Sequence, residues 1–391
     1  MKICFYADTF FPLVGGAEIV LHNLASQLTQ WGEEIYILAP RVRGADNKEQ
    51  FPYLVHRFGK PSSKRFLVRQ TLIHLLWLHF RYRFDLLHCH SGYPPGYVGA
   101  TFKKWFDTPI VVRPHGSDIV PGERIRKNPR LEKRLRRALV SADAIVAQGQ
   151  YLKDVIMDLG VEEKKIHIIH NGVNLEIFSK AEAFPYPRPY IVSLGNLIPR
   201  KGFDVLLHAY ARLRGPKPDL IMAGPGPEKD KLQLLAKDLG VAERVRFPGF
   251  IEGQDKINLL CSAEFFVCPS RKEPFANVIL EALAAGLPVV ASAVDGNPEL
   301  VHHGKQGLLF PSEDIEALES SLQSMINNTT LAHRLRSAVP GFAKQFDWPI
   351  VARQYQTLFY TLIERDPPFT KGIYNFNLMP KSGKRGRFET G

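Results

Sequence analysis

Short apolar runs rich in β-branched and aromatic residues alternate with amphipathic stretches along most of this chain, and no other feature constrains its fold as much. Helical stretches such as 17–31, 130–140, 204–213 and 228–239 separate the apolar runs. Parallel strands need a crossover connection, which is usually a helix, so the pattern predicts an α/β fold with doubly wound parallel sheets. The expected strands are 2–7, 34–38, 53–58, 85–89, 109–113, 144–147, 166–170, 190–194, 219–223, 245–248, 265–269 and 288–291.

The alternation is interrupted once, between residues 171 and 190. The stretch 183–189 (AFPYPRP) is too rich in proline for a helix interior and is typical of a linker. A chain of 391 residues also exceeds what one core usually fills. We therefore expect an N-terminal domain at 1–180, a C-terminal domain at 181–365 whose last helix can return to the first domain, and a flexible basic tail at 366–391. Ligands of doubly wound sheets bind beyond the carboxyl ends of the strands, hence here in the cleft between the domains.

Composition narrows the classes of protein that fit. The four cysteines show no Cys-x-x-Cys spacing, so a zinc site or disulfide framework is not expected. The apolar run 72–80 is far too short to span a bilayer, and the N-terminus resembles a strand more than a secretory signal, so we expect a cytoplasmic protein. The net charge of +12 is uneven: residues 1–183 carry 26 basic and 18 acidic residues (+8), and the rest carry 25 and 21 (+4).

The segment 269–282 (PSRKEPFANVILEA) is the most informative in the chain. A strand ends, a loop carries Glu273, and a helix begins near Phe275. Free main-chain N–H groups at a helix start, together with the helix dipole, bind a diphosphate, so Ala276, Asn277 and Val278 are predicted to contact one. Glu281 can accept hydrogen bonds from ribose hydroxyls, and Glu273 can bind sugar hydroxyls. Two acids eight residues apart can equally mark a solvated helix face, but the strand–loop–helix context favours a binding site.

Glycines and a lysine at other strand ends fit the same ligand. Gly15 and Gly16 follow the first strand and open a helix, where a missing side chain lets the main chain approach a phosphate or a sugar. A lone pair of glycines otherwise marks a turn. Lys201 follows another strand and a short loop, where its ammonium group can neutralise charge on a leaving diphosphate.

Taken together, these segments resemble a known family. SRKEPFANVILEALAAGLPVVAS, from Ser270, resembles the Glu-x7-Glu signature of glycosyltransferase family 4, whose members are retaining enzymes with the GT-B fold of two Rossmann-like domains facing across a cleft. The resemblance extends from Met1 to about Glu364. Further segments that resemble family motifs are GNLIPRKG (195–202), AGPGPE (223–228), RFPGF (246–250) and DGNPELV (295–301).

The resemblance implies roles for individual residues. Glu273, Lys201 and His115 are expected to be catalytic, with His115 beside the transferring sugar. Asp118 is expected to orient the surroundings of His115 or the acceptor. The remaining implied contacts are Gly16 and Gly224 on the donor side and Gly15 on the acceptor side.

The chain departs from the family pattern at two positions. Asn196 stands where the family usually has an arginine, and Arg200 is the candidate that takes over its catalytic role. Asn174 replaces an acid, which favours a turn or hinge there. His88 and His90 lie at a strand end without partners spaced for zinc, and an inert role is the simpler interpretation.

No Asp-x-Asp occurs in the sequence, so we expect no metal and no cofactor besides the nucleotide diphosphate-sugar itself. Eight of the fourteen residues from Arg124 to Arg137 are Lys or Arg, and 56–84 mixes basic residues with leucines and aromatics. This charge can be a solvated face over a leucine core, or a surface for anionic lipid or a phosphorylated acceptor. No nucleic-acid-binding module accompanies it.

The sequence thus predicts a metal-independent retaining enzyme that moves a hexose-type sugar from a UDP- or GDP-sugar to a hydroxyl of a glycan, a lipid-linked molecule or a small molecule. It would be cytoplasmic, with possible peripheral contact with an anionic membrane. Two alternatives stay open: a sugar-nucleotide epimerase of the same architecture, and a non-catalytic nucleotide-sugar sensor.

Overall fold

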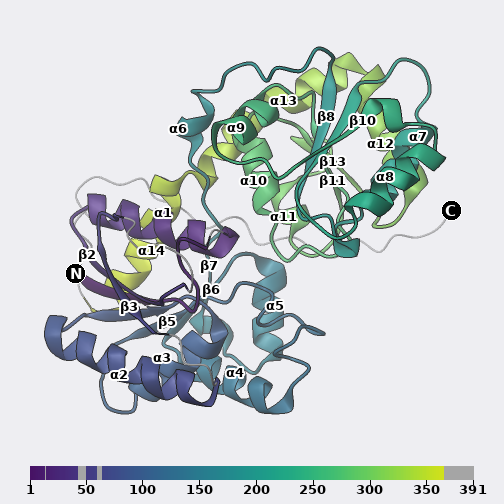
Figure 1. Cartoon of the computed structure of the whole chain (residues 1–391). Coiled ribbons are helices and arrows are strands. Elements are labelled where there is room, and N and C mark those ends of the chain that lie inside the picture. The colour runs from purple at the N-terminus through teal and green to yellow at the C-terminus, as the bar shows by residue number, and fades with distance from the viewer. Residues whose placement is uncertain (14, 43–49, 60–63, 365–391) are drawn as a thin grey trace.

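A computed structural model describes residues 1–13, 15–42, 50–59 and 64–364 of the protein. Two α/β domains follow one another, each a twisted parallel sheet with helices on both faces (Figure 1). The prediction of a two-domain fold with doubly wound parallel sheets is therefore confirmed. The expected tail at 366–391 lies outside the described residues.

The N-terminal sheet has the strand order β3-β2-β1-β4-β5-β6-β7, and all of its described pairs are parallel. Its strands are β1 (Lys2–Tyr6), β2 (Glu34–Pro40), β3 (Leu54–Phe58), β4 (Leu86–Cys89), β5 (Ile110–Val112), β6 (Ala144–Ala147) and β7 (Ile166–Ile168). The helices of this half are α1 (Gly16–Gln30), α2 (Lys64–Tyr82), α3 (Tyr97–Phe102), α4 (Pro129–Ser141) and α5 (Gln150–Asp158).

The C-terminal sheet repeats this winding, with the order β10-β9-β8-β11-β12-β13. Its strands are β8 (Tyr190–Leu194), β9 (Asp219–Ala223), β10 (Val245–Gly249), β11 (Phe266–Cys268), β12 (Val289–Ser292) and β13 (Gly307–Phe310). Its helices are α6 (Leu175–Phe178), α7 (Phe203–Arg212), α8 (Lys229–Asp238), α9 (Gly253–Cys261), α10 (Asn277–Ala284), α11 (Asn297–Leu300), α12 (Ile315–Asn327) and α13 (Thr329–Ala343), before the last helix α14 (Trp348–Leu362).

Both sheets are covered on both faces, which explains why their strands are almost continuously apolar. One face of the N-terminal sheet packs against α2 to α5 and the other against α1 and α14. Local signals set helix starts: the Asn128 side chain accepts from the main-chain N–H groups of Arg130 and Leu131, and Pro129 occupies the first position of α4.

The chain passes between the domains twice. The first passage is at residues 169–174, where the N–H of Val173 donates to the Phe346 carbonyl; the second brings α14 back onto α1 and the N-terminal core. The proline-rich stretch 183–189 is not a free linker. Phe184 and Tyr186 pack on the C-terminal core, and the Tyr186 hydroxyl donates to Asp219. The sequence interpretation was wrong here because two aromatic side chains hold this stretch in place.

The elements α13 and β13 were not among those expected in the C-terminal half, and α2 was not among the helices named for the N-terminal half. Helix α13 contains Pro340 in its interior, and α2 is apolar on more than one face, so neither shows a simple helical pattern. Strand order reverses between β1 and β4 and between β8 and β11. These are the two points at which a doubly wound sheet opens a ligand crevice.

Candidate functional site

Two loops of the N-terminal domain contact the Glu273 segment of the C-terminal domain. A Cβ placed on Gly16, at the start of α1, would lie 2.7 Å from the Asn277 Nδ2 atom. A Cβ on Gly116, whose φ is +90°, would lie 3.1 Å from the Pro274 Cβ. The positive φ favours glycine at 116, and a side chain at Gly16 would displace the Asn277 amide. The structure thus brings the Glu273 loop, predicted to bind the donor, next to the loop that carries His115.

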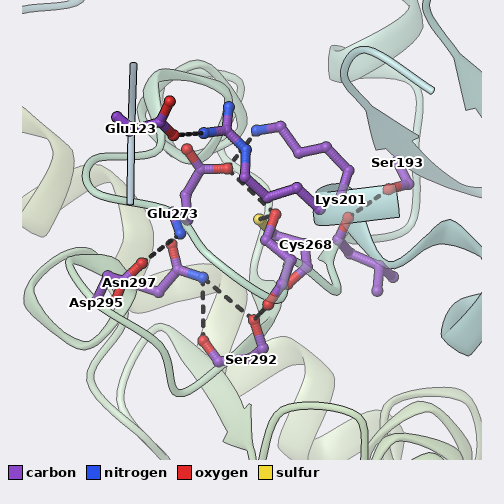
Figure 2. Close-up of polar contacts among 11 residues, drawn as sticks. Glu123, Ser193, Lys201, Cys268, Glu273, Ser292, Asp295 and Asn297 are labelled. Carbon is purple, nitrogen blue, oxygen red and sulfur yellow. Dashed lines mark hydrogen bonds and ion pairs between the residues drawn. The ribbon is translucent and has the colours of Figure 1, made fainter. Parts of the chain in front are cut away.

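Glu273 lies at the centre of this region, in the loop after β11. Its carboxylate is almost buried and pairs with the Lys201 ammonium, while the Ser270 hydroxyl donates to the same oxygen at 3.2 Å. The main-chain N–H of Glu273 donates to Asp295 at 2.7 Å. Figure 2 shows Lys201 and Glu273 side by side, with Asp295 beneath. Two residues predicted from separate motifs therefore form one polar pair 72 positions apart in sequence.

The start of α10 follows within four residues of Glu273. Ala276 is the buried N-cap, and Asn277 and Val278 form the first helical positions, where main-chain N–H groups have no partner inside a helix. Glu281, one turn further on, pairs with Lys256 of α9 at 2.7 Å. A ribose that used Glu281 would have to share it with this lysine, which the sequence did not indicate.

Gly224 lies at the end of β9 rather than beside open space. A Cβ on it would lie 2.0 Å from the Gly195 carbonyl oxygen, and its φ is +143°, so only glycine fits. A Cβ on Gly195 would in turn lie 3.7 Å from the Lys201 Cε. Gly224 therefore supports the loop that carries Lys201, and a direct contact with the donor stays a prediction.

Arg200 does not follow Lys201 toward Glu273. Both belong to the 3-10 turn Pro199–Lys201, and the Arg200 guanidinium instead lies 3.6 Å from Glu123 of the N-terminal domain. Asn196 is exposed on the same loop. Substitution of the missing arginine by Arg200 stays a prediction, and in this structure Arg200 bridges the domains.

His115 follows β5 and is held by a buried arginine that sequence reasoning missed. Arg113 donates from Nη1 to the His115 Nδ1 at 2.9 Å. Burial, followed by the nearby His90 and Arg113, holds the pKa of His115 well below its usual value. The His90 ring lies 4.3 Å from that of His115, and burial lowers the pKa of His90 to about 3. His90 therefore lies in the same cluster as His115, although the sequence favoured an inert role for it.

Asp118 organises the loop around His115. One carboxylate oxygen accepts from the His115 N–H at 2.8 Å, and the other accepts from the Gly92 N–H at 2.6 Å. Burial raises the pKa of Asp118, although these hydrogen bonds oppose the rise. An orienting role fits this geometry. Gly15, the N-cap of α1, lies on the same domain, and contacts of Gly15 and Asp118 with an acceptor stay predictions.

Glu299 of α11 makes a further contact between the domains. Its carboxylate accepts from the main-chain N–H of Gln150 at 2.8 Å and of Tyr151 at 3.2 Å, at the start of α5. His170 lies 3.8 Å away. Burial raises the pKa of Glu299, but the bonds from His170 and the two N–H groups outweigh it and leave the pKa lowered. The only sequence signal for Glu299 was its place in the family-like segment 295–301.

Within residues 1–13, 15–42, 50–59 and 64–364, no group of three or more His, Cys, Asp or Glu side chains could hold a metal ion. In the same part of the chain, no helix is long and apolar enough to cross a membrane.

Two Rossmann-like domains, with polar loops meeting at their switch points, define a protein of the GT-B class. Sequence profiles agree with this architecture: residues 14–177 match "Glycosyltransferase Family 4" and residues 175–340 match "Glycosyl transferases group 1". The chain belongs to the GT-B glycosyltransferases of family 4.

Individual relatives are distant but similar over almost their full length. N-acetyl-alpha-D-glucosaminyl L-malate synthase of Bacillus anthracis is 25% identical over 92% of this chain and 97% of its own. Phosphatidyl-myo-inositol mannosyltransferase of Mycobacterium leprae is 29% identical over 93% and 97%. Among solved structures, Thermosynechococcus elongatus sucrose-phosphate synthase has a TM-score of 0.80 at 22% identity, covering 93% and 99%. Anabaena HepE in complex with UDP-glucose has a TM-score of 0.71 at 24% identity, covering 92% and 100%.

Proposed function

We propose that this glycosyltransferase is retaining and metal-independent, and that it transfers a hexose-type sugar from a nucleotide diphosphate-sugar to an acceptor hydroxyl. The donor diphosphate would lie at the start of α10 and against Lys201, with the ribose at Glu281. Glu273 would hold the sugar from the C-terminal domain and His115 from the N-terminal domain. No cofactor or metal is part of the proposal.

The reaction would proceed on one face of the sugar. The bond between the anomeric carbon and the diphosphate oxygen breaks, and the acceptor oxygen bonds to the same face of that carbon. The hydroxyl proton passes to the leaving diphosphate. Lys201 and the N–H groups of α10 would stabilise the charge that develops on the diphosphate, because fixed donors in a desolvated site cost no reorganisation.

One observation carries this proposal: the almost buried Lys201–Glu273 pair beside the free end of α10. A buried carboxylate and ammonium are costly to desolvate, and such pairs often stabilise a fold no better than apolar residues would. In a site that binds both hydroxyls and phosphate, the carboxylate can accept hydrogen bonds from the hydroxyls and the ammonium can bind the phosphate.

Lys201→Met and Glu273→Gln test the assignment. We expect each to lower turnover by at least about a hundredfold, the typical effect of losing one electrostatic contact to a transition state. Lys272→Ala is the matched control, because Lys272 is exposed in the same loop. Turnover in either variant within a few-fold of that of Lys272→Ala would contradict the roles. Proton NMR of the product reads the anomeric configuration, and an inverted product would contradict retention.

The base and the sugar are proposed more broadly. UDP- and GDP-sugars are the candidates, and the likeness to HepE, solved with UDP and with UDP-glucose, favours UDP. A thermal-shift screen of nucleotide-sugars tests this choice, because a ligand that binds only the folded protein raises its melting temperature. A sugar altered while still attached to its nucleotide would instead indicate an epimerase, and binding without any transfer would indicate a sensor.

We also propose peripheral contact with an anionic membrane, through a face that we call the α2 face. The helix presents large apolar side chains to solvent at residues 66, 73, 77 and 80, and Trp105 after α3 joins them; all five are between 50% and 66% exposed. Their spacing of three, four and seven residues places the four helical members on one side of α2. The α2 face consists of Phe66, Ile73, Trp77, Phe80 and Trp105.

Charge around the α2 face selects an anionic partner. Residues 59–84 contain six Lys or Arg and no Asp or Glu. Helix α3 packs between α2 and the basic helix α4, and Figure 1 places all three on the side of the N-terminal domain away from the C-terminal domain. Aromatic residues favour the membrane interface, and each nearby basic residue adds about 1 kcal/mol on an anionic surface.

Vesicle flotation tests this contact without donor or acceptor. We expect binding to vesicles that contain phosphatidylglycerol, weaker binding to phosphatidylcholine alone, and weakening by salt. Trp77→Ser with Phe80→Ser should lower the affinity at least about tenfold, since each apolar side chain contributes about 1.5–3 kcal/mol when fully buried. Leu234→Ser on α8, equally exposed in the other domain, is the control. Equal loss in both variants, or self-association through the α2 face in place of vesicle binding, would overturn the proposal.

A further inference from the structure

Arg113 is a buried cation whose three nearest partners are all neutral. Its side chain has no solvent exposure. Nε donates to the Tyr355 hydroxyl at 2.8 Å, Nη1 to the His115 Nδ1 at 2.9 Å, and Nη2 to the Asn171 side-chain oxygen. Within the described residues, no carboxylate lies at ion-pair distance from this guanidinium. Burying a charge without a counterion costs free energy, so the stability of the fold alone does not explain an arginine at this position.

The guanidinium determines which nitrogen of His115 carries the proton. An arginine side chain can only donate, so the Nδ1 that receives its N–H must be the unprotonated nitrogen. Burial, with the cation beside it, keeps the ring neutral, because both disfavour a second charge. The single ring proton of His115 therefore lies on Nε2.

That buried Nε2–H group has no acceptor within hydrogen-bond distance among the described residues. The main chain of His90 favours a proton on the ring, but this effect is the smallest of those that act on the pKa of His115. The Nε2 of the neighbouring His90 contacts the Ala17 carbonyl at 2.9 Å, and its Nδ1 makes no hydrogen bond to His115 or to any other described residue. A Cβ on the next residue, Gly116, would lie 3.1 Å from the Pro274 Cβ, so the loop of His115 faces the Glu273 loop. A buried donor without a partner is destabilising, and an acceptor that arrives with the ligand would remove that cost.

We propose that Arg113 is a positioning residue: it fixes His115 as the Nε2–H tautomer, so that His115 donates a hydrogen bond to an oxygen of the transferring sugar and does not act as a base. This inference rests on the proposed function for the identity of the ligand. The tautomer itself does not, since it is a property of the protein alone.

The same cation orders polar groups across the domain contact. Because Arg113 donates to the Asn171 oxygen, the amide nitrogen of Asn171 is turned the other way and donates to the Asn277 side-chain oxygen at 2.6 Å. The Asn277 nitrogen then faces Gly16. One guanidinium thus sets the orientation of His115, of the segment between the domains and of the first residue of α10.

Nitrogen-15 NMR of histidine-labelled protein tests the tautomer directly, with the His115 signals assigned by their loss in His115→Gln. We expect the proton on Nε2 in the unmodified protein and a mixture or an Nδ1 proton in Arg113→Met, where Nδ1 has lost its donor. Tyr355→Phe is the matched control, because it removes a different partner of Arg113 and should leave the tautomer unchanged. A proton on Nδ1 in the unmodified protein, or no change in Arg113→Met, would overturn the proposal.

A second comparison does not require Arg113 to be replaced. The amide nitrogen of glutamine can occupy the place of Nε2, whereas that of asparagine reaches only the place of Nδ1. We expect His115→Gln to keep at least about fivefold more of kcat than His115→Asn, from a net hydrogen-bond contribution of about 1 kcal/mol.

The pH profile of kcat gives a further readout that a purely structural role would not change. It should show no ionisation of His115 near neutrality. The charged or titratable groups around His115 are His88 on β4, His90 directly after β4, Arg113 directly after β5 and Asp118 in the following loop. Equal kcat in the glutamine and asparagine variants would refute the inference. An acid limb in the profile of the unmodified protein that disappears in both variants would show that His115 acts as a base, and would also refute it.

Discussion

Replacing Glu299 by glutamine removes one negative charge from the contact between the domains while keeping the side chain's shape. In the structure this carboxylate accepts from the N–H groups of Gln150 and Tyr151, 149 and 148 positions away in sequence. Glutamine keeps one acceptor oxygen and places an NH2 group opposite a main-chain donor. We expect the closed arrangement of the domains to become less favourable.

The size of the effect follows from the contacts. Hydrogen bonds to a charged group contribute about 1.5–3 kcal/mol and neutral ones about 0.5–1.5 kcal/mol, so two bonds lose about 2 kcal/mol. The charge also faces the N-terminal end of the α5 dipole, which adds about 0.3–1 kcal/mol. The Glu299 side chain is 22% exposed, so solvent screening reduces the sum. About 2 kcal/mol remains, or about a thirtyfold shift in the equilibrium between closed and open domains.

Small-angle X-ray scattering measures this equilibrium, and kcat/KM for transfer measures its consequence. Glu299→Gln should scatter as a more extended particle, and its kcat/KM should fall by up to about thirtyfold. Glu316→Gln is the control. The Glu316 side chain is 88% exposed and its ion pair with Arg212 is long, at 4.0 Å, so the loss of its charge should change little. Identical scattering and turnover in the two variants would refute the reasoning.

The pH dependence of the same contact has a definite sign. The pKa of Glu299 is lowered in the folded protein from its ordinary value of 4.5. The contact therefore contributes fully above that ordinary value and is lost as the pH falls through the folded pKa. Below it, the unmodified protein should scatter like Glu299→Gln; a difference that persists in strong acid would mean that the charge is not what holds the domains.

Three further predictions concern single residues. Burial holds the pKa of His88 well below 6.5, so below pH 6.5 the buried neutral ring destabilises the fold by roughly 1.4 kcal/mol per pH unit. As the pH is lowered, the melting temperature of His88→Leu should therefore fall less steeply than that of the unmodified protein. Equal slopes would contradict this. Lys256→Met should lower the Kd for donor about two- to fivefold by freeing Glu281, whereas weaker binding in titration calorimetry would show that Lys256 itself contacts the ligand. Gly224→Ala should lower the melting temperature by several degrees at least, since its Cβ would lie 2.0 Å from a carbonyl oxygen; an unchanged value would mean that the Gly195 turn can move.

The donor half of the site could be predicted from sequence because its chemistry is local. Glu273, the start of α10 and Glu281 belong to one strand–loop–helix segment, and Lys201 follows another strand of the same sheet. Parallel strands carry their carboxyl ends to a common edge, so residues after different strands meet without any knowledge of their packing. Most strands also ended within two residues of the expected positions, because buried parallel strands are continuous apolar runs.

The residues that join the two domains could not be predicted in this way. Arg113 finds Tyr355 at a separation of 242 positions, and Glu299 finds the start of α5 at 149. Their partners depend on how α14 returns to the first domain and how the domains face each other, which no local pattern records. The only local sign of Arg113 was a charged residue directly after an apolar strand, a place where burial demands a partner.

Helix α2 shows how a failed pattern can itself be informative. A helix that only covers a core should be apolar on one side and polar on the other, and the sequence of α2 shows no such division. The structure explains the difference: Leu75 and Leu78 fill the inward face, while Ile73, Trp77 and Phe80 lie outward in solvent. The inward set satisfies the fold, so the outward set is not required by it. Positions where sequence reasoning about a fold fails are expected to serve function. The proposal of a membrane contact therefore rests on the exposed apolar residues of the α2 face more than on the basic residues around it.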